Sequence, residues 1–466
     1  MYSANFHTYF QQLKAAFPPL VAIFAVCLPL GWSSPALQKL QLGDSNLGRP
    51  LTHDEGSLFI SLITISEIPG TLAMMVSIDY FGRRLACILL LIPSFVAWMI
   101  FTFSTNIIIF YLGRVLAGMS VGMGVTLLPI YLGEIASKDF RGTLLTLLAT
   151  IGNTVDPIIE FILTPLVSLT ASAAISSVPS IMALFLMYWS YESPYYLVMK
   201  NKIPEARKCL ENIRYKTVDN DKTITDELNE IERTIIAQTK NKASLHELFV
   251  VKSNRTAIIY MTIIHTIKSC VGLPIIRYFI HIVVEQLNLD LSANTVALTV
   301  MILTVLGSIS STIFVRKLGK TVLMIASLIG CFLSTLIIAI YFNFANKEEF
   351  WIQWIPVICL LVYAYMHGLG IVTLPYAYLG ELFAANIKTY AVVFSKCYLA
   401  LCYFVITSVF QSIFDYNNAY PFYFFAFSSF IGILFFKFVM PETDRKSFYE
   451  IQVLLGAKYD DVEGNL

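Results

Sequence analysis

Six ionisable side chains lie inside long apolar stretches of this sequence, where an isolated charge is costly. They are three acids and three bases: Glu67, Asp156, Glu160, Lys268, Arg277 and Lys396. Asp156 and Glu160 are four residues apart, so they would share one face of a helix. Charges in such places face the protein interior, where they pair with one another or mark the path of a solute or a proton.

Two interpretations of these charges are open. In the first, the equal numbers of acids and bases form structural pairs between neighbouring helices. In the second, they surround a polar cavity that binds a charged or zwitterionic solute, or that couples transport to protons. Charges near the ends of the apolar stretches would instead extend their side chains to the headgroup level of a bilayer.

The elements that must position these residues are membrane-spanning helices. Of the 466 residues, 57% are hydrophobic and only 14% are charged, whereas an average soluble protein has ~25% charged residues. A bilayer core requires ~20 apolar residues per helix. Twelve stretches approach this length: residues 17–37, 57–78, 85–104, 107–130, 143–165, 171–190, 256–281, 293–315, 321–342, 351–375, 389–413 and 420–440. The predicted fold class is therefore an all-α membrane protein with twelve transmembrane helices.

Basic residues indicate the orientation of these helices. With a cytoplasmic N-terminus, the inner segments carry most of the lysines and arginines, and the outer segments carry only Lys39, Arg49 and Lys347. One long polar segment, with two amphipathic stretches, follows the sixth span. We expect four parts: an N-terminal half (1–191), a cytoplasmic linker (192–254), a C-terminal half (255–440) and a cytoplasmic tail (441–466).

A short motif recurs in the two halves. Tyr-Leu-Gly-Glu occurs at Tyr131–Glu134 and at Tyr378–Glu381, in each case after a proline and near the inner end of an apolar stretch. A base follows each glutamate by seven residues, as Arg141 in the first copy and Lys388 in the second. Two six-helix halves related by a parallel repeat are typical of the major facilitator fold.

Motifs for catalysis, nucleotide binding and metal binding are absent from the sequence. It has no P-loop, no Gly-x-Ser-x-Gly, no His-Glu-x-x-His and no dinucleotide fingerprint. Its eight cysteines include no Cys-x-x-Cys pair. The net charge of +1 gives no reason to expect a nucleic-acid partner. We expect a protein that is not an enzyme and that uses no metal or other cofactor.

Segments along nearly the whole chain carry a family signature. They are Gly31–Leu37, Leu51–Ser57, Asp79–Arg84, Gly113–Gly122, Pro129–Gly142, Glu192–Lys200, Tyr378–Phe383 and Pro441–Ile451. With these segments the chain resembles the sugar porter family of major facilitators, and within it the insect facilitated trehalose transporter group. The most specific part is the string at Pro129–Gly142, together with Glu-Ser-Pro and Pro-Glu-Thr at the ends of the halves.

The resemblance implies a cytoplasmic gate, in which acids and bases at the inner helix ends pair when the protein opens outward. The residues are Asp79, Arg83, Arg84, Glu134, Arg141, Glu192, Glu381, Lys388 and Glu442. Pairs that form in one state and break in the other bias a two-state equilibrium without contacting the solute. Arg114, in the fourth span, resembles a buried arginine of the family and should have an acidic or carbonyl partner.

The sequence departs from the family where a sugar should bind. Ala149 and the stretch Ile267–Leu273 stand where the family has side-chain amides, and Thr304 takes the position of another asparagine. Aromatic rings stack on sugars and phenol hydroxyls bond to them, so tyrosines in the later spans are candidates. The candidate substrate-binding residues are Tyr278, Thr304, Tyr376, Tyr398, Lys268 and Glu160.

We therefore expect a secondary transporter that works by alternating access. The resemblance implies a facilitative carrier of trehalose or a hexose. A carrier of a charged or zwitterionic organic solute, with or without proton coupling, is the first alternative, and a non-transporting sugar sensor is the second. The expected partners are a small solute and the lipid bilayer, for a monomer in the plasma membrane with both termini in the cytoplasm.

Overall fold

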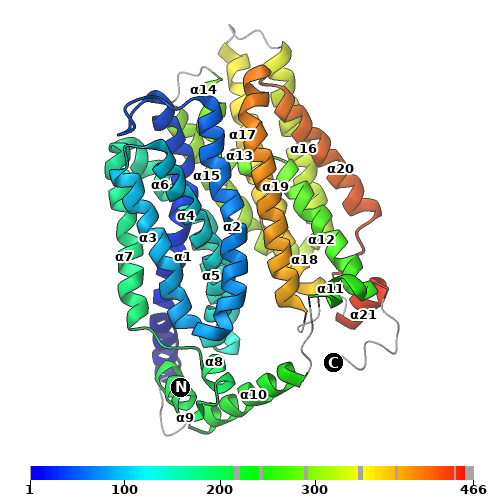
Figure 1. Ribbon diagram of the computed structural model, residues 1–466. Helices are drawn as coiled ribbons and strands as arrows, with labels where there is room; N and C mark the ends of the chain where they lie inside the picture. Colours follow the sequence, from blue (N-terminus) through cyan, green and yellow to red (C-terminus); the bar gives the residue numbers. More distant parts are fainter. Residues whose placement is uncertain are drawn as a thin grey trace. The chain divides into compact units, whose positions relative to one another are not determined.

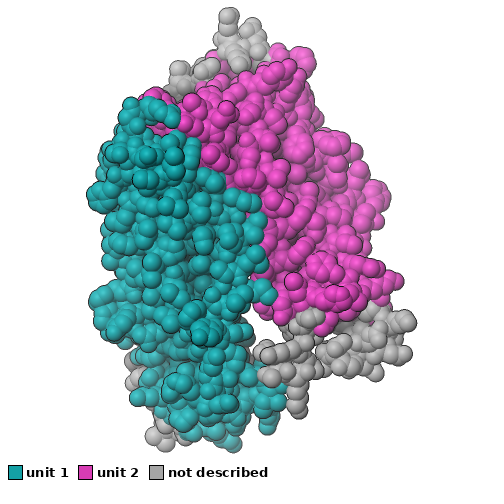
Figure 2. All heavy atoms as spheres, viewed as in Figure 1, with its two compact units in different colours: residues 1–32, 44–49, 62–242 teal, residues 33–43, 50–61, 243–466 magenta. Residues whose placement is uncertain are grey.

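The computed structural model describes residues 2–214, 221–240, 245–287, 292–344, 350–383, 387–444 and 448–456, and within these the regular structure is helical (Figure 1). The chain divides into two compact units (Figure 2). Unit 1 comprises Met1–Trp32, Asp44–Arg49 and Leu62–Lys242. Unit 2 comprises Ser33–Gly43, Pro50–Ser61 and Ala243–Leu466. The first two long helices therefore each contribute residues to both units.

Ten helices among the described residues are long and apolar enough to cross a membrane. Those in the first part of the chain are α1 (Tyr2–Leu42), α2 (His53–Phe81), α3 (Arg83–Phe103), α4 (Ile107–Ile135) and α7 (Leu169–Tyr188). Those in the second part are α15 (Ala293–Leu318), α16 (Lys320–Phe344), α17 (Phe350–His367) with its continuation, α19 (Lys388–Tyr416) and α20 (Tyr420–Phe438). Each corresponds to one of the twelve predicted spans.

The other two predicted spans are broken helices. The fifth consists of α5 (Lys138–Thr150), the π-helical turn η1 (Ile151–Val155) and α6 (Asp156–Leu166). Pro157 follows the π turn and has no N–H to continue the usual hydrogen-bond ladder, so the helix changes its winding there. The seventh consists of α12 (Lys252–Cys270), α13 (Leu273–Tyr278) and α14 (Ile280–Glu285). Gly272 ends α12 because its φ of 108° leaves the helical region.

The tenth span is irregular in the same way as the fifth. After α17 comes a π-helical turn, η3 (Gly368–Val372), and then α18 (Leu374–Leu382), which has Pro375 as its second residue. Proline at a helix start costs no hydrogen bond, whereas in a helix interior it removes one. The break lets the chain start a new helix, α18, which carries Tyr376 and Glu381.

Glycines allow close helix packing inside each unit. A methyl group on Gly70 would lie 2.1 Å from the carbonyl oxygen of Met119, and one on Gly122 would lie 2.1 Å from that of Glu67, so α2 and α4 touch backbone to backbone. In unit 2, Gly307 of α15 would approach the carbonyl of Tyr365 to 2.2 Å in the same way. Small residues are the usual means by which membrane helices approach this closely.

Parts of the first two helices pack into unit 2. Ser34 Oγ of α1 lies 2.8 Å from His281 Nδ1 of α14. Ser57 of α2 donates a hydrogen bond of 3.5 Å to the Gln411 side chain of α19. His53, at the start of α2, forms an ion pair with Asp415 near the end of α19 when it is protonated. Unit 2 is therefore completed by residues from the beginning of the chain.

The segment between the two halves contains the helices that the amphipathic patterns predicted. After α8 (Pro194–Met199), α9 (Ile203–Arg214) and α10 (Asp221–Lys240) lie at one end of unit 1 (Figure 1). Arg214 holds them to the rest of the unit. Its Nη1 donates to the Ile135 carbonyl at 2.8 Å, and its Nε and Nη2 donate to the two carboxylate oxygens of Glu227 at 3.0 and 2.7 Å.

Replacing Arg214 with alanine should detach α9 and α10 from the end of α4. The variant loses the three hydrogen bonds that the Arg214 guanidinium donates. A buried hydrogen bond from a charged group contributes about 2 kcal/mol. We expect faster cleavage of this segment by proteinase K in the purified protein. Arg207→Ala is the matched control, because Arg207 lies on the same helix with its side chain 40% exposed. Equal cleavage rates for the two variants would contradict the prediction.

Candidate gate and solute-binding sites

Arg83, the second residue of the Gly-Arg-Arg motif, is the centre of a cluster of charges in unit 1. Its side chain is only 9% exposed. The Nε and Nη2 atoms donate to the two carboxylate oxygens of Glu134 at 2.9 Å each, and Asp79 lies 3.5 Å from Nη1. The backbone N–H of Arg83 donates to the carboxylate of Glu192 at 2.8 Å. We call these four residues the Arg83 cluster.

Local backbone geometry places the Glu192 carboxylate at the N-terminus of α3. Gly82 has a φ of 86°, and a methyl group there would lie 2.8 Å from Glu192 Oε2, so only glycine fits. The carboxylate accepts from the first N–H groups of α3, including that of Arg84 at 3.2 Å. A negative charge is favourable at this end of a helix because it pairs with the unbonded N–H groups.

The linker also contacts Glu192, through α9. The Cys209 thiol of α9 donates to the Glu192 carbonyl oxygen at 3.1 Å. Burial raises the pKa of the Cys209 thiol to about 12, and the nearby Glu192 charge adds to the rise. The thiol therefore remains a neutral donor at physiological pH. The Arg83 cluster is thus joined to α9 as well as to α3, α4 and the start of α8.

Unit 2 contains a second cluster with the same plan. Gly319 has a φ of 83°, and the backbone N–H of Lys320 donates to Asp444 Oδ2 at 2.6 Å. The Lys320 ammonium forms an ion pair with Glu381 and lies 3.2 Å from Asp444 Oδ1. We call these three residues the Lys320 cluster. Lys320 corresponds to Arg83, Glu381 to Glu134, and Asp444 to Glu192.

Lys320 and Asp444 were not among the predicted gate residues. The signal for Lys320 is the Gly319-Lys320 pair, which repeats Gly82-Arg83. Asp444 lacks a comparable signal, because the Glu-Ser-Pro and Pro-Glu-Thr motifs suggest that Glu442 is the residue of the second half that corresponds to Glu192. In the structure Glu442 instead accepts a hydrogen bond from Thr321 at 3.3 Å.

Three other predicted gate residues make different contacts. Arg84 donates from its guanidinium to the Tyr188 carbonyl. Lys388 donates to the Gly380 carbonyl at 2.9 Å rather than to a carboxylate. Arg141 is outside the Arg83 cluster, and its buried Nε has no hydrogen-bond partner among the described residues. The two clusters therefore hold most of the predicted acids and only part of the predicted bases.

The charges of unit 1 that have no exposed surface lie on α4 and α6. Arg114, Asp156 and Glu160 are all fully buried. Arg114 donates to the Pro29 carbonyl of α1 at 3.2 Å. The Glu160 carboxylate accepts from the hydroxyl of Ser176 at 2.6 Å and from that of Thr164 at 3.0 Å. Hydroxyl donors stabilise a buried carboxyl group without neutralising it.

Apart from Arg114, the intramembrane charges divide by sign between the two units. Glu67, Asp156 and Glu160 belong to unit 1, and Lys268, Arg277 and Lys396 belong to unit 2. Within unit 2, Lys268 donates to the Val372 carbonyl at 3.3 Å, and Lys396 donates to the Tyr376 hydroxyl at 3.3 Å. Pairing between acids and bases inside one unit therefore does not account for the two lysines.

The other predicted binding residues of unit 2 lie near these lysines or in the packed interior. The Tyr398 hydroxyl is 2.8 Å from that of Thr266 on α12. Thr304 donates within its own helix to Val300 at 2.9 Å. Tyr278 is buried, at 2% exposure, whereas Tyr376 is 40% exposed. Of the four, Tyr376 is the one whose ring both faces open space and contacts charged groups.

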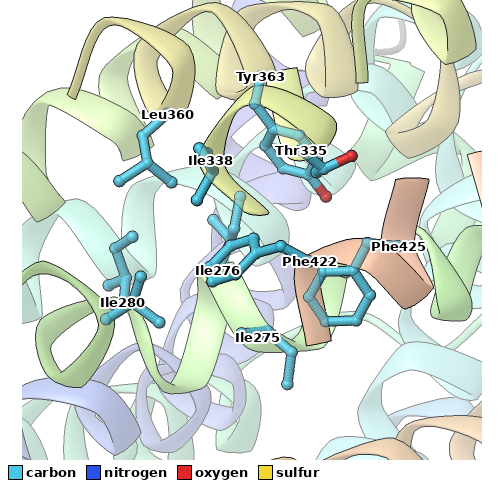
Figure 3. Close-up of a pocket in the computed structure, with 11 residues that line it drawn as sticks. Ile275, Ile276, Ile280, Thr335, Ile338, Leu360, Tyr363, Phe422 and Phe425 are labelled. Atoms are coloured by element: carbon cyan, nitrogen blue, oxygen red, sulfur yellow. The ribbon is translucent and has the colours of Figure 1, made fainter. Parts of the chain in front are cut away.

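An apolar pocket in unit 2 is a poor site for a polar solute (Figure 3). Ile275, Ile276 and Phe425 contribute to its lining. The two hydroxyls at its wall are already used, because Tyr363 donates to the Val271 carbonyl at 2.7 Å and Thr335 donates to a carbonyl of its own helix at 2.8 Å. A sugar in this pocket would lose hydrogen bonds to water without replacing them.

Membrane-spanning helices in two halves that repeat the same charge cluster are typical of a secondary membrane transporter. The family model "Sugar (and other) transporter" matches residues 36–455, and the chain belongs to that family. The protein is therefore a transporter and not an enzyme, as the sequence predicted.

Known proteins similar to this chain agree with the family assignment. The facilitated trehalose transporter Tret1 of Bombyx mori is 25% identical over 450 residues, which are 95% of this chain and 86% of that protein. The xylose transporter XylE of E. coli, solved in an inward open conformation, is 16% identical with a TM-score of 0.76, over 96% of this chain and 99% of XylE. The structure of XylE bound to 6-bromo-6-deoxy-D-glucose, described as a major facilitator superfamily protein, has a TM-score of 0.70 at 17% identity. It covers 96% of this chain and 99% of XylE. The predicted major facilitator fold is confirmed.

Proposed function

We propose that the protein carries a sugar across the plasma membrane, down its concentration gradient, by alternating access. The observation that carries the proposal is the similarity to a trehalose transporter over 95% of the chain. The repeated Arg83 and Lys320 clusters support it, because each holds helix ends together within one unit by contacts that can form and break. A sugar such as trehalose or a hexose is the proposed solute.

In this proposal the two moving parts are the two halves of the chain, residues 1–191 and 255–440. The halves would rock about a solute held near the middle of the membrane. The linker 192–254, the tail and both termini would lie in the cytoplasm, as the distribution of basic residues favours. The protein would act as a monomer, and the two clusters would serve as the cytoplasmic gate.

Uptake measurements test this proposal directly. Cells that express the protein, with its amount at the surface measured, are given labelled glucose or trehalose at external pH 6 and pH 7.5. We expect saturable uptake of at least one of the two sugars, with the same rate at both pH values. Rates that follow the proton gradient would contradict facilitative transport. The absence of uptake of both sugars, with protein present at the surface, would contradict the proposed solute.

A further inference from the structure

Two lysines in unit 2 converge on one tyrosine ring. The Nζ atom of Lys268, on α12, is 4.6 Å from the centre of the Tyr376 ring on α18, and that of Lys396, on α19, is 4.7 Å from it. Lys396 also donates to the Tyr376 hydroxyl at 3.3 Å. Three separate helices therefore bring two positive charges to the same ring.

These two charges are not neutralised by the residues around them. Among the residues that the structure describes, the ammonium groups of Lys268 and Lys396 hydrogen-bond to the Val372 carbonyl and the Tyr376 hydroxyl and lie near the Tyr376 ring. Neither forms an ion pair with a carboxylate in this part of the chain. Lys268 is only 3% exposed. Like charges held close together in a poorly hydrated place repel each other, and an aromatic ring or a carbonyl offsets only part of that cost.

A third polar group at this place lacks a partner. His265 lies one turn before Lys268 on α12 and is 3% exposed, and neither of its ring nitrogens has a hydrogen-bond partner in the described part of the chain. It is close enough to both lysines to interact with their charges. Arg277 of α13 is close enough to interact with Lys268 and Tyr376. Positive charge is thus gathered around Tyr376, and neither lysine there has a carboxylate partner among the described residues.

The tyrosine gives this cluster access to a solute. Tyr376 is 40% exposed, although the groups around it are buried or half-buried. A neutral sugar that stacked on its ring would leave both ammonium charges uncompensated. An oxyanion within reach of Lys268 and Lys396 would receive charge-assisted hydrogen bonds from both, which are about twice as strong as neutral ones.

We infer that Lys268, Lys396 and Tyr376 form an oxyanion-binding site, and that the preferred solute is a sugar derivative bearing a carboxylate or a phosphate. This inference rests on the proposed sugar transport and narrows its solute class. The two lysines bind the oxyanion, the Tyr376 hydroxyl donates a further hydrogen bond, and the ring packs against the sugar carbons. The retained family scaffold and the loss of the family's amides both fit a sugar held mainly through its charge.

Calorimetric titration of the purified full-length protein with glucuronate, glucose 6-phosphate and glucose tests the inference. We expect at least one of the two anions to bind ten or more times as tightly as glucose, and the stronger anion to identify carboxylate or phosphate as the natural group. Lys268→Met and Lys396→Met should each weaken anion binding roughly tenfold or more, and should lower the preference for the anion over glucose by a similar factor. Lys396→Arg, which keeps the charge, should retain most of the anion binding.

Lys437→Met is the matched control. Lys437 also lies near an aromatic ring, 5.2 Å from that of Phe438, but it is exposed at the end of α20. The Lys437→Met variant should bind the anions with the same affinity as the unchanged protein. Anion binding that is no tighter than glucose binding, or that survives both lysine substitutions in folded protein, overturns the inference. Glucose binding without anion binding would overturn it while leaving the proposed sugar transport intact.

Discussion

Replacing Gly122 with alanine is expected to prevent the protein from accumulating in folded form, whereas Gly133→Ala on the same helix should be tolerated. A Cβ atom on Gly122 would lie 2.1 Å from the carbonyl oxygen of Glu67, which is backbone and has no other rotamer to adopt. The helices α2 and α4 would have to separate along their contact. Overpacking of this kind costs about 3 kcal/mol or more when the backbone must move.

Gly133 provides a close control for this prediction. It is also in α4, and a Cβ atom there would meet no atom within 4 Å. Alanine favours a helix by ~1 kcal/mol over glycine, so Gly133→Ala should be neutral or slightly stabilising. Size-exclusion profiles and thermal unfolding in detergent measure both variants. A Gly122→Ala protein as stable as Gly133→Ala would show that α2 and α4 do not meet at this point.

Glu134→Gln is expected to lower the rate of solute uptake more than Glu381→Gln does, at equal amounts of protein at the cell surface. The Arg83 guanidinium depends on Glu134 for two hydrogen bonds of 2.9 Å, and its second carboxylate contact, Asp79, is 69% exposed. Loss of one partner from a buried ion pair costs ~3–5 kcal/mol. Lys320, in contrast, would keep Asp444 at 3.2 Å when Glu381 is replaced.

We expect at least a tenfold loss of initial uptake rate for Glu134→Gln and a loss of a few-fold for Glu381→Gln. The double variant Arg83→Met/Glu134→Met separates gating from folding, because it removes both members of the buried pair, and the Asp79 carboxylate that remains is 69% exposed. It should regain thermal stability relative to Glu134→Gln without regaining transport. Equal losses for the two glutamine variants would mean that the asymmetry between the clusters has no effect on gating.

The membrane spans were predictable because lipid imposes a length and a polarity on each of them. The breaks in the fifth and seventh spans were not located, since hydropathy does not register the conformation of Gly272 or the missing N–H of Pro157. The repeated Tyr-Leu-Gly-Glu motif led to Glu134 and Glu381, which both lie in charge clusters. Asp444 was missed because motif similarity favoured its neighbour Glu442.

The intramembrane charges show a different limit of sequence analysis. Counting acids and bases suggested pairing, because the numbers are equal. Counting does not say which side chains meet, and the structure places the three acids in one unit and the three bases in the other. The cluster at Tyr376 joins α12 to the consecutive helices α18 and α19, which follow it by more than a hundred residues. The two lysines come together at one ring only in the folded structure, so the sequence does not reveal this local excess of positive charge.

Residues 33–43 and 50–61 belong to the compact unit formed by the second half of the chain. The contacts of Ser34 with His281 and of Ser57 with Gln411 are part of that unit. A fragment that begins after the linker therefore lacks two of its own structural pieces, as a domain-swapped protein does without its partner. The two repeats are therefore not interchangeable copies: unit 2 requires residues from the beginning of the chain, whereas unit 1 takes none from beyond Lys242.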